Sequence, residues 1–393
     1  MSFYLALLPS VFFSIYNVDL SVIYIMSSAL KNSLQAIRSV IKDIQAYQVA
    51  DASGLIKLDA MENPYQLSDQ LRAELRVKLS VADLNRYPDP SASRLRNKLK
   101  QVMQVPEDKS IVLGNGSDEL IQILAMAVAE DDVCLMSFDP GFVMYKMIAD
   151  FVGIKYAGVA LCEDFSLDME KTRQAINQHR PAIIFIAYPN NPSANCYNEN
   201  EIEEIIAMAP GMVVLDEAYH PFAQRSFMQR LTEFDNLLVM RTVSKMGLAG
   251  LRLGLLCGHP DIINEIDKIR LPYNINVLTQ ISAEFVLDNI AELDQQAKKI
   301  RDERELLSEA MNAISGLEVF PSQANFILFR VLDGGENNSA NDVFDSIKQA
   351  GVLIKNMKVD EGLLKNCLRV TVGTAEENKA FVAALVSAMN DEK

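Results

Sequence analysis

Residues 240–254 of the chain read MRTVSKMGLAGLRLG, and this stretch places one lysine, Lys245, among hydroxyl-bearing residues, small residues and an arginine. The apolar run NLLVM at 236–240 comes directly before it and predicts a buried strand. Lys245 is therefore expected near a strand end, where side chains of α/β proteins converge on ligands. A desolvated lysine amine is a nucleophile that can form a Schiff base, and hydroxyls with an arginine suit a phosphate group. By itself, a Ser-Lys pair is more often a solvated feature of a helix start.

Two apolar runs upstream predict further buried strands that end in polar side chains. Residues 213–216 read VVLD and end in Asp216, and residues 183–188 read IIFIAY and lead into a turn that contains Asn191. An acid that faces the pyridine nitrogen is what pyridoxal 5'-phosphate (PLP) needs beside its lysine. The Asn191 amide and the Tyr219 hydroxyl can both bond the phenolic oxygen of that cofactor. A tyrosine after a strand can equally be a packing residue.

A third segment offers a site for the phosphate group. Residues 110–113, SIVL, predict a strand that leads through GNGSDE into a helix beginning near Ser117 and Asp118. The unpaired backbone N–H groups at a helix start bind anions. The same pattern also describes an ordinary helix capped by Ser117 or Asp118, without a ligand. Together with the lysine and the aspartate, the four segments predict a PLP site.

In this order, the segments resemble those of the fold-type-I PLP-dependent aminotransferases, and within that family they look most like the histidinol-phosphate aminotransferases. The narrower resemblance is carried by LDAMENPY (58–65), RYPDP (86–90), GNGSDE (114–119), YPNNP (188–192), DEAY (216–219), SK (244–245), GLR (250–252), RLPYN (270–274) and LRVTVGT (368–374). The resemblance implies an α/β protein of fold type I. Its large domain would contain a mainly parallel seven-stranded sheet, and its smaller domain would be α+β.

The resemblance also implies roles for individual residues. Lys245 matches the Schiff-base lysine and general base, Asp216 the partner of the pyridine nitrogen, and Asn191 and Tyr219 the groups at the phenolic oxygen. Phe142 matches an aromatic residue that stacks on the cofactor ring. The residues matched to the phosphate position are Ser117, Asp118, Thr242, Ser244 and Arg252.

Further matches concern the substrate and the partner subunit. Arg369 matches the arginine that pairs with the α-carboxylate of glutamate and with the phosphate of histidinol phosphate. Lys355 stands where some relatives have a second arginine, so a point charge replaces a planar fork. Asn63 is a further expected substrate contact. Tyr65 matches a residue that reaches the cofactor phosphate of the neighbouring subunit, which implies a homodimer.

The implied reaction exchanges the amino group between L-histidinol phosphate and 2-oxoglutarate, giving imidazole acetol phosphate and glutamate, in histidine biosynthesis. Two alternatives stay open. An aromatic amino-acid aminotransferase would differ from it by few side chains. A PLP-dependent lyase that decarboxylates threonine phosphate would share the lysine, the aspartate and the arginines. A regulator with an aminotransferase-like domain would need a basic helix-turn-helix module, for which the N-terminal residues have neither the length nor the charge.

The composition narrows the class of protein. The chain has 393 residues, 49% hydrophobic and 23% charged, which is typical of a soluble globular enzyme large enough for two lobes. A formal net charge of -15 argues against nucleic acid as a partner. Five cysteines without a C-x-x-C pair and three histidines predict neither a disulfide framework nor a metal site. We expect reduced thiols and a cytoplasmic protein without a membrane partner.

The hydrophobic patterning and the resemblance together divide the chain into four parts. Residues 1–27 are apolar but interrupted by polar residues and lack a basic flank, which fits neither a signal peptide nor a membrane span. We expect this part to be a non-native or disordered extension, with Met26 as the natural start. Residues 28–70 would form an N-terminal arm and part of the small domain, and residues 71–275 the large PLP-binding domain. Residues 276–393 would form a connecting helix and the small C-terminal domain.

Overall fold

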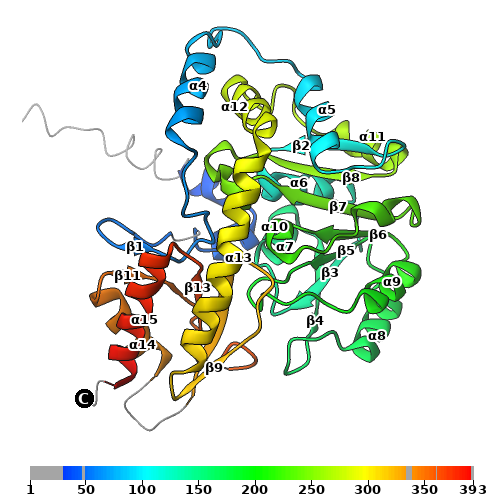
Figure 1. Ribbon diagram of the computed structural model, residues 1–393. Helices are drawn as coiled ribbons and strands as arrows, with labels where there is room; N and C mark the ends of the chain where they lie inside the picture. The colour runs from blue at the N-terminus through cyan, green and yellow to red at the C-terminus, as the bar shows by residue number, and fades with distance from the viewer. Residues whose placement is uncertain (1–29, 47–48, 333–338, 360, 391–393) are drawn as a thin grey trace, which may run out of the picture. The chain divides into compact units, whose positions relative to one another are not determined.

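The computed structural model describes residues 30–46, 49–332, 339–359 and 361–390 (Figure 1). Its contacts divide into two units, Met1–Ala50 and Asp51–Lys393. In the first unit, residues 30–36 are helical and a short helix α3 (Ser39–Asp43) follows after a break. The expectations for residues 1–27 and for Met26 fall outside the described residues.

The main sheet of the second unit has seven strands in the order β2-β8-β7-β6-β5-β3-β4. Its strands are β2 (Ser110–Gly114), β3 (Cys134–Asp139), β4 (Lys155–Ala160), β5 (Ile183–Ala187), β6 (Met212–Asp216), β7 (Leu237–Thr242) and β8 (Gly254–Gly258). β8 is antiparallel to both of its neighbours, and the other pairs are parallel. The apolar runs of the sequence form β2, β5, β6 and β7, and the expected mainly parallel sheet is confirmed.

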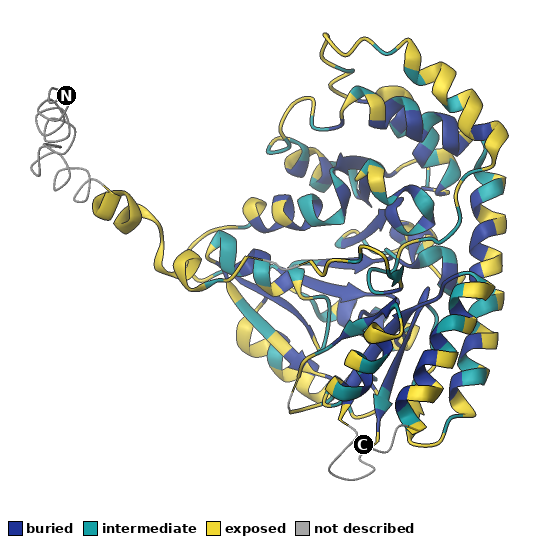
Figure 2. Ribbon diagram, turned by 90° about the vertical axis from the view of Figure 1, so that its left-hand side faces the viewer, coloured by how far each residue is buried: buried dark blue, intermediate teal, exposed yellow. Residues whose placement is uncertain are grey.

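Helices cover both faces of this sheet, which explains why its inner strands β5, β6 and β7 are buried at nearly every position instead of alternating. In β6, Val213 and Leu215 belong to one core cluster and Val214 belongs to another. The first cluster includes residues of α5 (Ser93–Val102), α8 (Met169–His179), α9 (Glu199–Met208) and α12 (Val277–Asp288). The second includes residues of α6 (Gly116–Ala127), α7 (Met144–Val152) and α11 (Pro260–Asp267). Figure 2 shows the strands buried and the outward helix faces exposed.

A second, antiparallel sheet has four strands in the order β12-β13-β10-β9. Its strands are β9 (Leu317–Val319), β10 (Phe326–Val331), β12 (Lys355–Asn356) and β13 (Cys367–Thr371), with α14 (Ala340–Gln349) and α15 (Ala375–Asn390) beside them. Phe326, Phe329 and Phe381 are among its fully buried core residues. β1 (Ile56–Lys57) pairs in parallel with β11 (Val352–Leu353), which ties the N-terminal part of this unit to the C-terminal part. The expected α+β part is therefore present.

A single connecting helix was expected at the start of residues 276–393, but this part of the chain forms two helices. α12 ends at Asp288 and α13 (Ile290–Asn312) begins after Asn289, whose side-chain amide donates a hydrogen bond to the carbonyl of Phe285. Asparagine side chains compete with the backbone for hydrogen bonds in this way and so favour helix ends. The remaining helical elements of this unit are α4 (Asp69–Ser80), α10 (His220–Ala223), η1 (Met228–Thr232), η2 (Ser244–Leu248) and η3 (Ala249–Leu251). In the described part of the chain, no helix has both the length and the apolar character needed to cross a membrane.

Candidate active site

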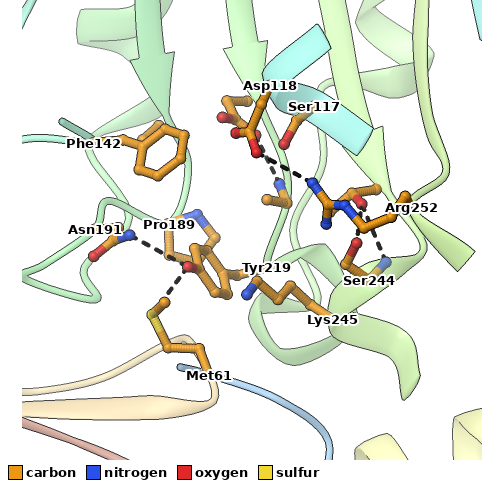
Figure 3. A pocket seen from close by; sticks show the side chains of 14 residues that line it. Met61, Ser117, Asp118, Phe142, Pro189, Asn191, Tyr219, Ser244, Lys245 and Arg252 are labelled. Carbon is orange, nitrogen blue, oxygen red and sulfur yellow. Dashed lines mark hydrogen bonds and ion pairs between the residues drawn. The ribbon is translucent and has the colours of Figure 1, made fainter. Parts of the chain in front are cut away.

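The carboxyl ends of β5, β6 and β7 meet at one edge of the main sheet, and a pocket lies there. Eleven residues were expected to hold the cofactor, and all of them except Tyr65 line this pocket. Figure 3 shows Ser117, Asp118 and Arg252 on one side of the pocket and Asn191 and Met61 on the other. Strand ends that meet at one edge of an α/β sheet form the usual ligand site of such folds.

Lys245 enters the pocket from η2, directly after β7. Its Nζ donates a hydrogen bond of 3.2 Å to the carbonyl oxygen of Ala60, and lies 5.8 Å from the centre of the Tyr219 ring. Burial lowers the pKa of Lys245 to about 8, and the positive charge of Arg369 acts in the same direction. The amine is therefore easier to deprotonate than that of an ordinary lysine, as a nucleophile requires.

Asp216 ends β6 and is only 4% exposed. Its Oδ1 accepts a hydrogen bond of 3.1 Å from the N–H of Ala218, and its Oδ2 accepts one of 2.8 Å from the hydroxyl of Tyr145. Burial raises the pKa of Asp216 to about 6. Among the residues that the structure describes, no basic side chain forms an ion pair with it. A buried carboxylate at the pocket wall without a cation of its own fits a cationic ring nitrogen.

The side of the pocket expected to bind a phosphate group is built on the turn between β2 and α6. Gly116 has φ +82°, and a Cβ atom there would lie 2.7 Å from Nη2 of Arg252, so the arginine packs over bare backbone. Arg252 also donates to the carboxylate of Asp118 at 3.2 Å. The hydroxyls of Thr242 and Ser244 lie 2.9 Å apart. A helix start, hydroxyls and a guanidinium together suit a phosphate group.

Asn191 connects the pocket to the second sheet. Its Nδ2 donates to the hydroxyl of Tyr219 at 3.4 Å, and its Oδ1 accepts a hydrogen bond of 2.5 Å from Arg369. The Tyr219 hydroxyl in turn donates to the sulfur of Met61 at 3.2 Å. The side chains expected at the phenolic oxygen are thus brought together.

Arg369 and Lys355 form a pair of cations next to the pocket, although neither of them lines it. They are cross-strand partners in β13 and β12. Arg369 is 6% exposed, donates to the carbonyl of Asp59 at 3.2 Å, and lies 5.2 Å from the centre of the Phe326 ring. Burial, followed by the charge of Arg369, lowers the pKa of Lys355. Two adjacent cations at this depth form a suitable contact for an anionic substrate group.

The structure places the two remaining expected residues outside the pocket lining. The amide nitrogen of Asn63 donates to the carbonyl of Met246 at 3.0 Å and to Gln296 at 2.9 Å, and its oxygen accepts from the N–H of Tyr65 at 2.8 Å. Asn63 therefore holds its loop against η2 and α13. Tyr65 is half-buried, with the ammonium group of Lys299 5.4 Å from its ring centre.

Several residues in or next to the pocket were not predicted from the sequence, chiefly Met61 and Tyr145. Met61 lies in the quoted segment 58–65, which was a usable signal, but nothing in the sequence indicates that its side chain enters the pocket. It does so because its backbone adopts φ +55° while its N–H donates to Thr371 at 2.9 Å. Tyr145 contacts Asp216 across 71 positions of the chain, which no local pattern reveals. Ala187, Pro189 and Ala218 complete the lining.

A family model described as aminotransferase class I and II matches residues 53–385. The chain belongs to the class I and II aminotransferases. This aminotransferase family depends on PLP. The pocket fits that cofactor on three independent features, which are the buried acid, the lysine of lowered pKa and the helix start with its arginine.

Relatives of this aminotransferase match along nearly their whole length. Histidinol-phosphate aminotransferase 2 of Nitrosococcus oceani is 52% identical over 89% of this chain and 96% of its own. The protein of the same name from Cupriavidus pinatubonensis is 50% identical over 90% of this chain and 97% of its own. Among solved structures, histidinol-phosphate aminotransferase of Sinorhizobium meliloti in complex with pyridoxal-5'-phosphate has a TM-score of 0.79 at 21% identity, covering 90% of this chain and 97% of that one. The last comparison establishes the shared fold.

Proposed function

We propose that this aminotransferase exchanges the amino group between L-histidinol phosphate and 2-oxoglutarate, producing imidazole acetol phosphate and glutamate. The observation that carries the proposal is the pair of cations beside the lysine pocket, which are the buried Arg369 and the half-buried Lys355. A phosphate on one substrate and a carboxylate on the other both suit such a pair. The names of the relatives at 52% and 50% identity support the same reaction.

Lys245 is proposed to hold the cofactor and to move the substrate proton. Bound PLP supplies a carbon that takes up the amino group and a ring that accepts electrons from the substrate α-carbon. The pKa of Lys245, lowered to about 8 by burial, leaves its amine able to bond that carbon and later to take and return the proton at the α-carbon. The carbonyl of Ala60, which accepts a hydrogen bond from Nζ, would hold the amine whenever it is not bonded to the cofactor.

The other lining residues are proposed to orient the ring. Asp216 would hold the ring nitrogen in its charged form, because an ionised carboxylate stabilises a cation in a buried site. Asn191 and Tyr219, already hydrogen-bonded to each other, would bind the phenolic oxygen from one side. Phe142 lines the pocket and would cover the face of the ring, excluding water from it.

The phosphate group of the cofactor would be bound by the start of α6 and by the side chains around it. Arg252 would carry the charge for this contact, and the hydroxyls of Ser117, Thr242 and Ser244 would lie around the phosphate. We assign Asp118 to this site through its backbone N–H, because its carboxylate is already paired with Arg252 and would repel a phosphate.

Arg369 and Lys355 are proposed to bind the anionic groups of both substrates. Arg369 offers a planar fork for a carboxylate or a phosphate, and its bond to Asn191 links substrate recognition to the cofactor side of the pocket. Lys355 adds a point charge, which suits the dianionic phosphate more than the carboxylate. Asn63 is proposed to support the substrate indirectly, by holding the loop that carries Met61.

A panel of amino donors with 2-oxoglutarate tests the proposal: histidinol phosphate, tyrosine, phenylalanine and threonine phosphate, offered to the PLP-loaded protein. We expect histidinol phosphate to have the highest kcat/KM. Lys355→Ala should lower its kcat/KM by about tenfold, with a smaller effect on glutamate, because a charge-assisted bond to phosphate is lost. Comparable use of phenylalanine would favour an aromatic aminotransferase, and release of carbon dioxide from threonine phosphate would favour a lyase.

We further propose that the active unit is a homodimer. An exposed apolar surface on the second unit supports this proposal. In this surface the rings of Tyr87 and Tyr273 stack, with 4.4 Å between their centres, and Leu271 lies two positions before Tyr273 in the chain. Tyr87 is 80% exposed and Leu271 is 75% exposed, which is costly for side chains that water surrounds. Association of two copies through this surface would cover these side chains. In such a dimer, Tyr65 would be the residue that reaches towards the neighbouring phosphate site.

The proposed domain limits follow the two sheets. All strands of the seven-stranded sheet lie between residues 110 and 258, inside the large domain of residues 71–275. All strands of the four-stranded sheet lie inside residues 276–393. For location, we propose the cytoplasm, which the free thiols of all five cysteines support. Measuring the enzyme in cytosolic and membrane fractions would test this.

A further inference from the structure

Tyr145 is buried directly behind the pocket and contacts the residue proposed to face the cofactor ring. It lies in α7, it is 1% exposed, and its hydroxyl donates a hydrogen bond of 2.8 Å to Oδ2 of Asp216. The other carboxylate oxygen accepts from the N–H of Ala218. The Tyr145 hydroxyl and the Ala218 N–H therefore each hold one oxygen of the carboxylate. Together they fix its rotation.

The ring of Tyr145 is held by aromatic neighbours on two sides. It stacks on Phe185 of β5 with 4.7 Å between centres and an interplanar angle of 10°. It also meets the edge of Phe142, which lines the pocket, at 5.5 Å and 87°. Because these contacts involve only the ring, the hydroxyl can be removed without disturbing them.

The charges around Asp216 act against its ionised form. Burial raises the pKa of Asp216. The carboxylates of Asp118 in α6 and of Glu217, which directly follows β6, act in the same direction. The hydrogen bonds from Tyr145 and from the Ala218 N–H act in the opposite direction. Glu217 is itself paired with Arg241 at 2.9 Å, so this arginine is already engaged. Burial and Asp216 hold the pKa of Tyr145 well above its ordinary value, so its hydroxyl remains a donor.

We propose that Tyr145 is a positioning residue that aims the Asp216 carboxylate into the pocket and, through its hydroxyl, keeps that carboxylate charged for a cationic ring nitrogen. The proposal rests on the role proposed above for Asp216. Tyr145 touches neither substrate nor cofactor in this arrangement. Its effect reaches the cofactor through one hydrogen bond, so it should determine how tightly the cofactor binds and over which pH range.

The test is Tyr145→Phe in the full-length protein after removal of the cofactor. Affinity for PLP is measured by equilibrium titration between pH 5.5 and 8.5, without any amino donor. At pH 7 we expect about tenfold weaker binding, the effect of losing a hydrogen bond to a charged group. Without the donor, Asp216 takes up a proton more readily, so the loss of affinity on acidification should move to higher pH.

A second ligand separates this role from a merely structural one. The probe is an analogue of PLP whose ring nitrogen is replaced by a carbon, because it offers the carboxylate no cation. Tyr145→Phe should bind this analogue as the wild type does. Tyr156→Phe is the matched control, since that hydroxyl lies 2.7 Å from the Ser137 hydroxyl and its residue does not line the pocket. It should change neither affinity.

Two results would overturn the proposal. Equal weakening of both ligands by Tyr145→Phe, or an unchanged pH dependence, would show that the hydroxyl acts only on packing. Equal affinity of the wild type for PLP and for the carbon analogue would remove the role of Asp216, and the proposal with it. Because no amino donor is present, neither result depends on whether histidinol phosphate is the substrate.

Discussion

Lys245 owes its chemistry to where its amine lies and not to its residue type alone. Its ammonium form is disfavoured by burial and by nearby Arg369, which together bring its pKa to about 8. Near neutral pH a useful fraction of this amine is therefore uncharged, whereas an exposed lysine is almost fully protonated. A fully solvated lysine at the same strand end would lack this property.

The first prediction identifies the lysine that bonds the cofactor. Borohydride reduction of the PLP-loaded protein should attach the cofactor covalently to Lys245, because its amine is the one in the pocket. Peptide mapping by mass spectrometry measures the position of the label. Lys245→Ala should lose both the label and the transaminase activity. Lys298→Ala, which changes an exposed lysine of α13 that pairs with Asp302 at 2.6 Å, serves as the control and should keep both. A label on another lysine would contradict the assignment.

The second prediction concerns the effect of Asp216 on the free energy of unfolding of the cofactor-free protein. Its folded-state pKa of about 6 lies above the ordinary value of 3.8 for an aspartate, so stability falls as the pH rises through this window. At about 1.4 kcal/mol per pKa unit, ionised Asp216 destabilises the cofactor-free fold by up to about 3 kcal/mol above pH 6. Asp216→Asn should therefore stabilise it at pH 7.5 and have little effect at pH 4.

Urea unfolding of both proteins at the two pH values measures this difference. An equal effect of the substitution at pH 4 and pH 7.5 would show that ionisation is not its cause. In the PLP-loaded enzyme, the same substitution should lower kcat by orders of magnitude, because the ring loses its charged partner. Asp216 would then be a residue that lowers stability and is kept for function.

At the scale of elements, the turn between β2 and α6 leaves little room for side chains beside the pocket. The Cβ of any residue at position 116 would come within 2.7 Å of Arg252, and the backbone there has φ +82°. Gly254 of β8 packs equally closely, since its Cβ would meet the carbonyl carbon of Gly116 at 2.7 Å. Glycine is needed at both positions so that helix start, strand and arginine can meet.

The third prediction tests this turn with Gly116→Ala. The added methyl group should displace Arg252 and strain the backbone by about 1–2 kcal/mol, so PLP affinity should fall by about tenfold or more. Gly250→Ala is the control, because a Cβ there would meet nothing within 4 Å. Fluorescence titration with PLP measures affinity, and thermal unfolding shows whether each variant is folded. Wild-type affinity in Gly116→Ala would contradict the proposed phosphate site.

At the scale of the whole molecule, the fourth prediction concerns the proposed dimer. Leu271→Asp places a charge in the exposed apolar surface around Tyr87 and Tyr273, and should shift the protein from dimer to monomer. Leu306→Asp is the control, because Leu306 is also exposed, at 60%, but lies on α13. Sedimentation velocity measures the oligomeric state. A dimer that persists in Leu271→Asp, or a monomeric wild type, would exclude this surface as the interface.

Much of the fold was predictable because it depends on local patterns. The strands β5, β6 and β7 are continuous apolar runs, and runs of this kind are buried between helices. The break at Asn289 was missed, because one asparagine within a helical pattern does not reveal whether its amide will bond the backbone. A single connecting helix was therefore expected where the structure has α12 and α13.

The pocket could be predicted only where its residues follow strands. Asn191, Asp216 and Lys245 each come soon after an apolar run, so parallel pairing alone brings them to one edge. The side-chain bonds of Asn63 to Met246 and Gln296 depend on how α13 lies against the lysine turn. These bonds could not be predicted from the sequence, and the expected contact of Asn63 with the substrate stays a prediction.

The sequence by itself determined which groups are available: a lysine, an acid and an anion-binding helix start, each placed by the short-range periodicity of a strand or helix. The tertiary structure alone decided their chemical state. The pKa of Lys245 depends on burial and on Arg369 from the second sheet, and that of Asp216 depends on burial and on Tyr145 of α7. The physical reason is that solvation and electrostatic interactions depend on distance in space, whereas a sequence pattern records only distance along the chain.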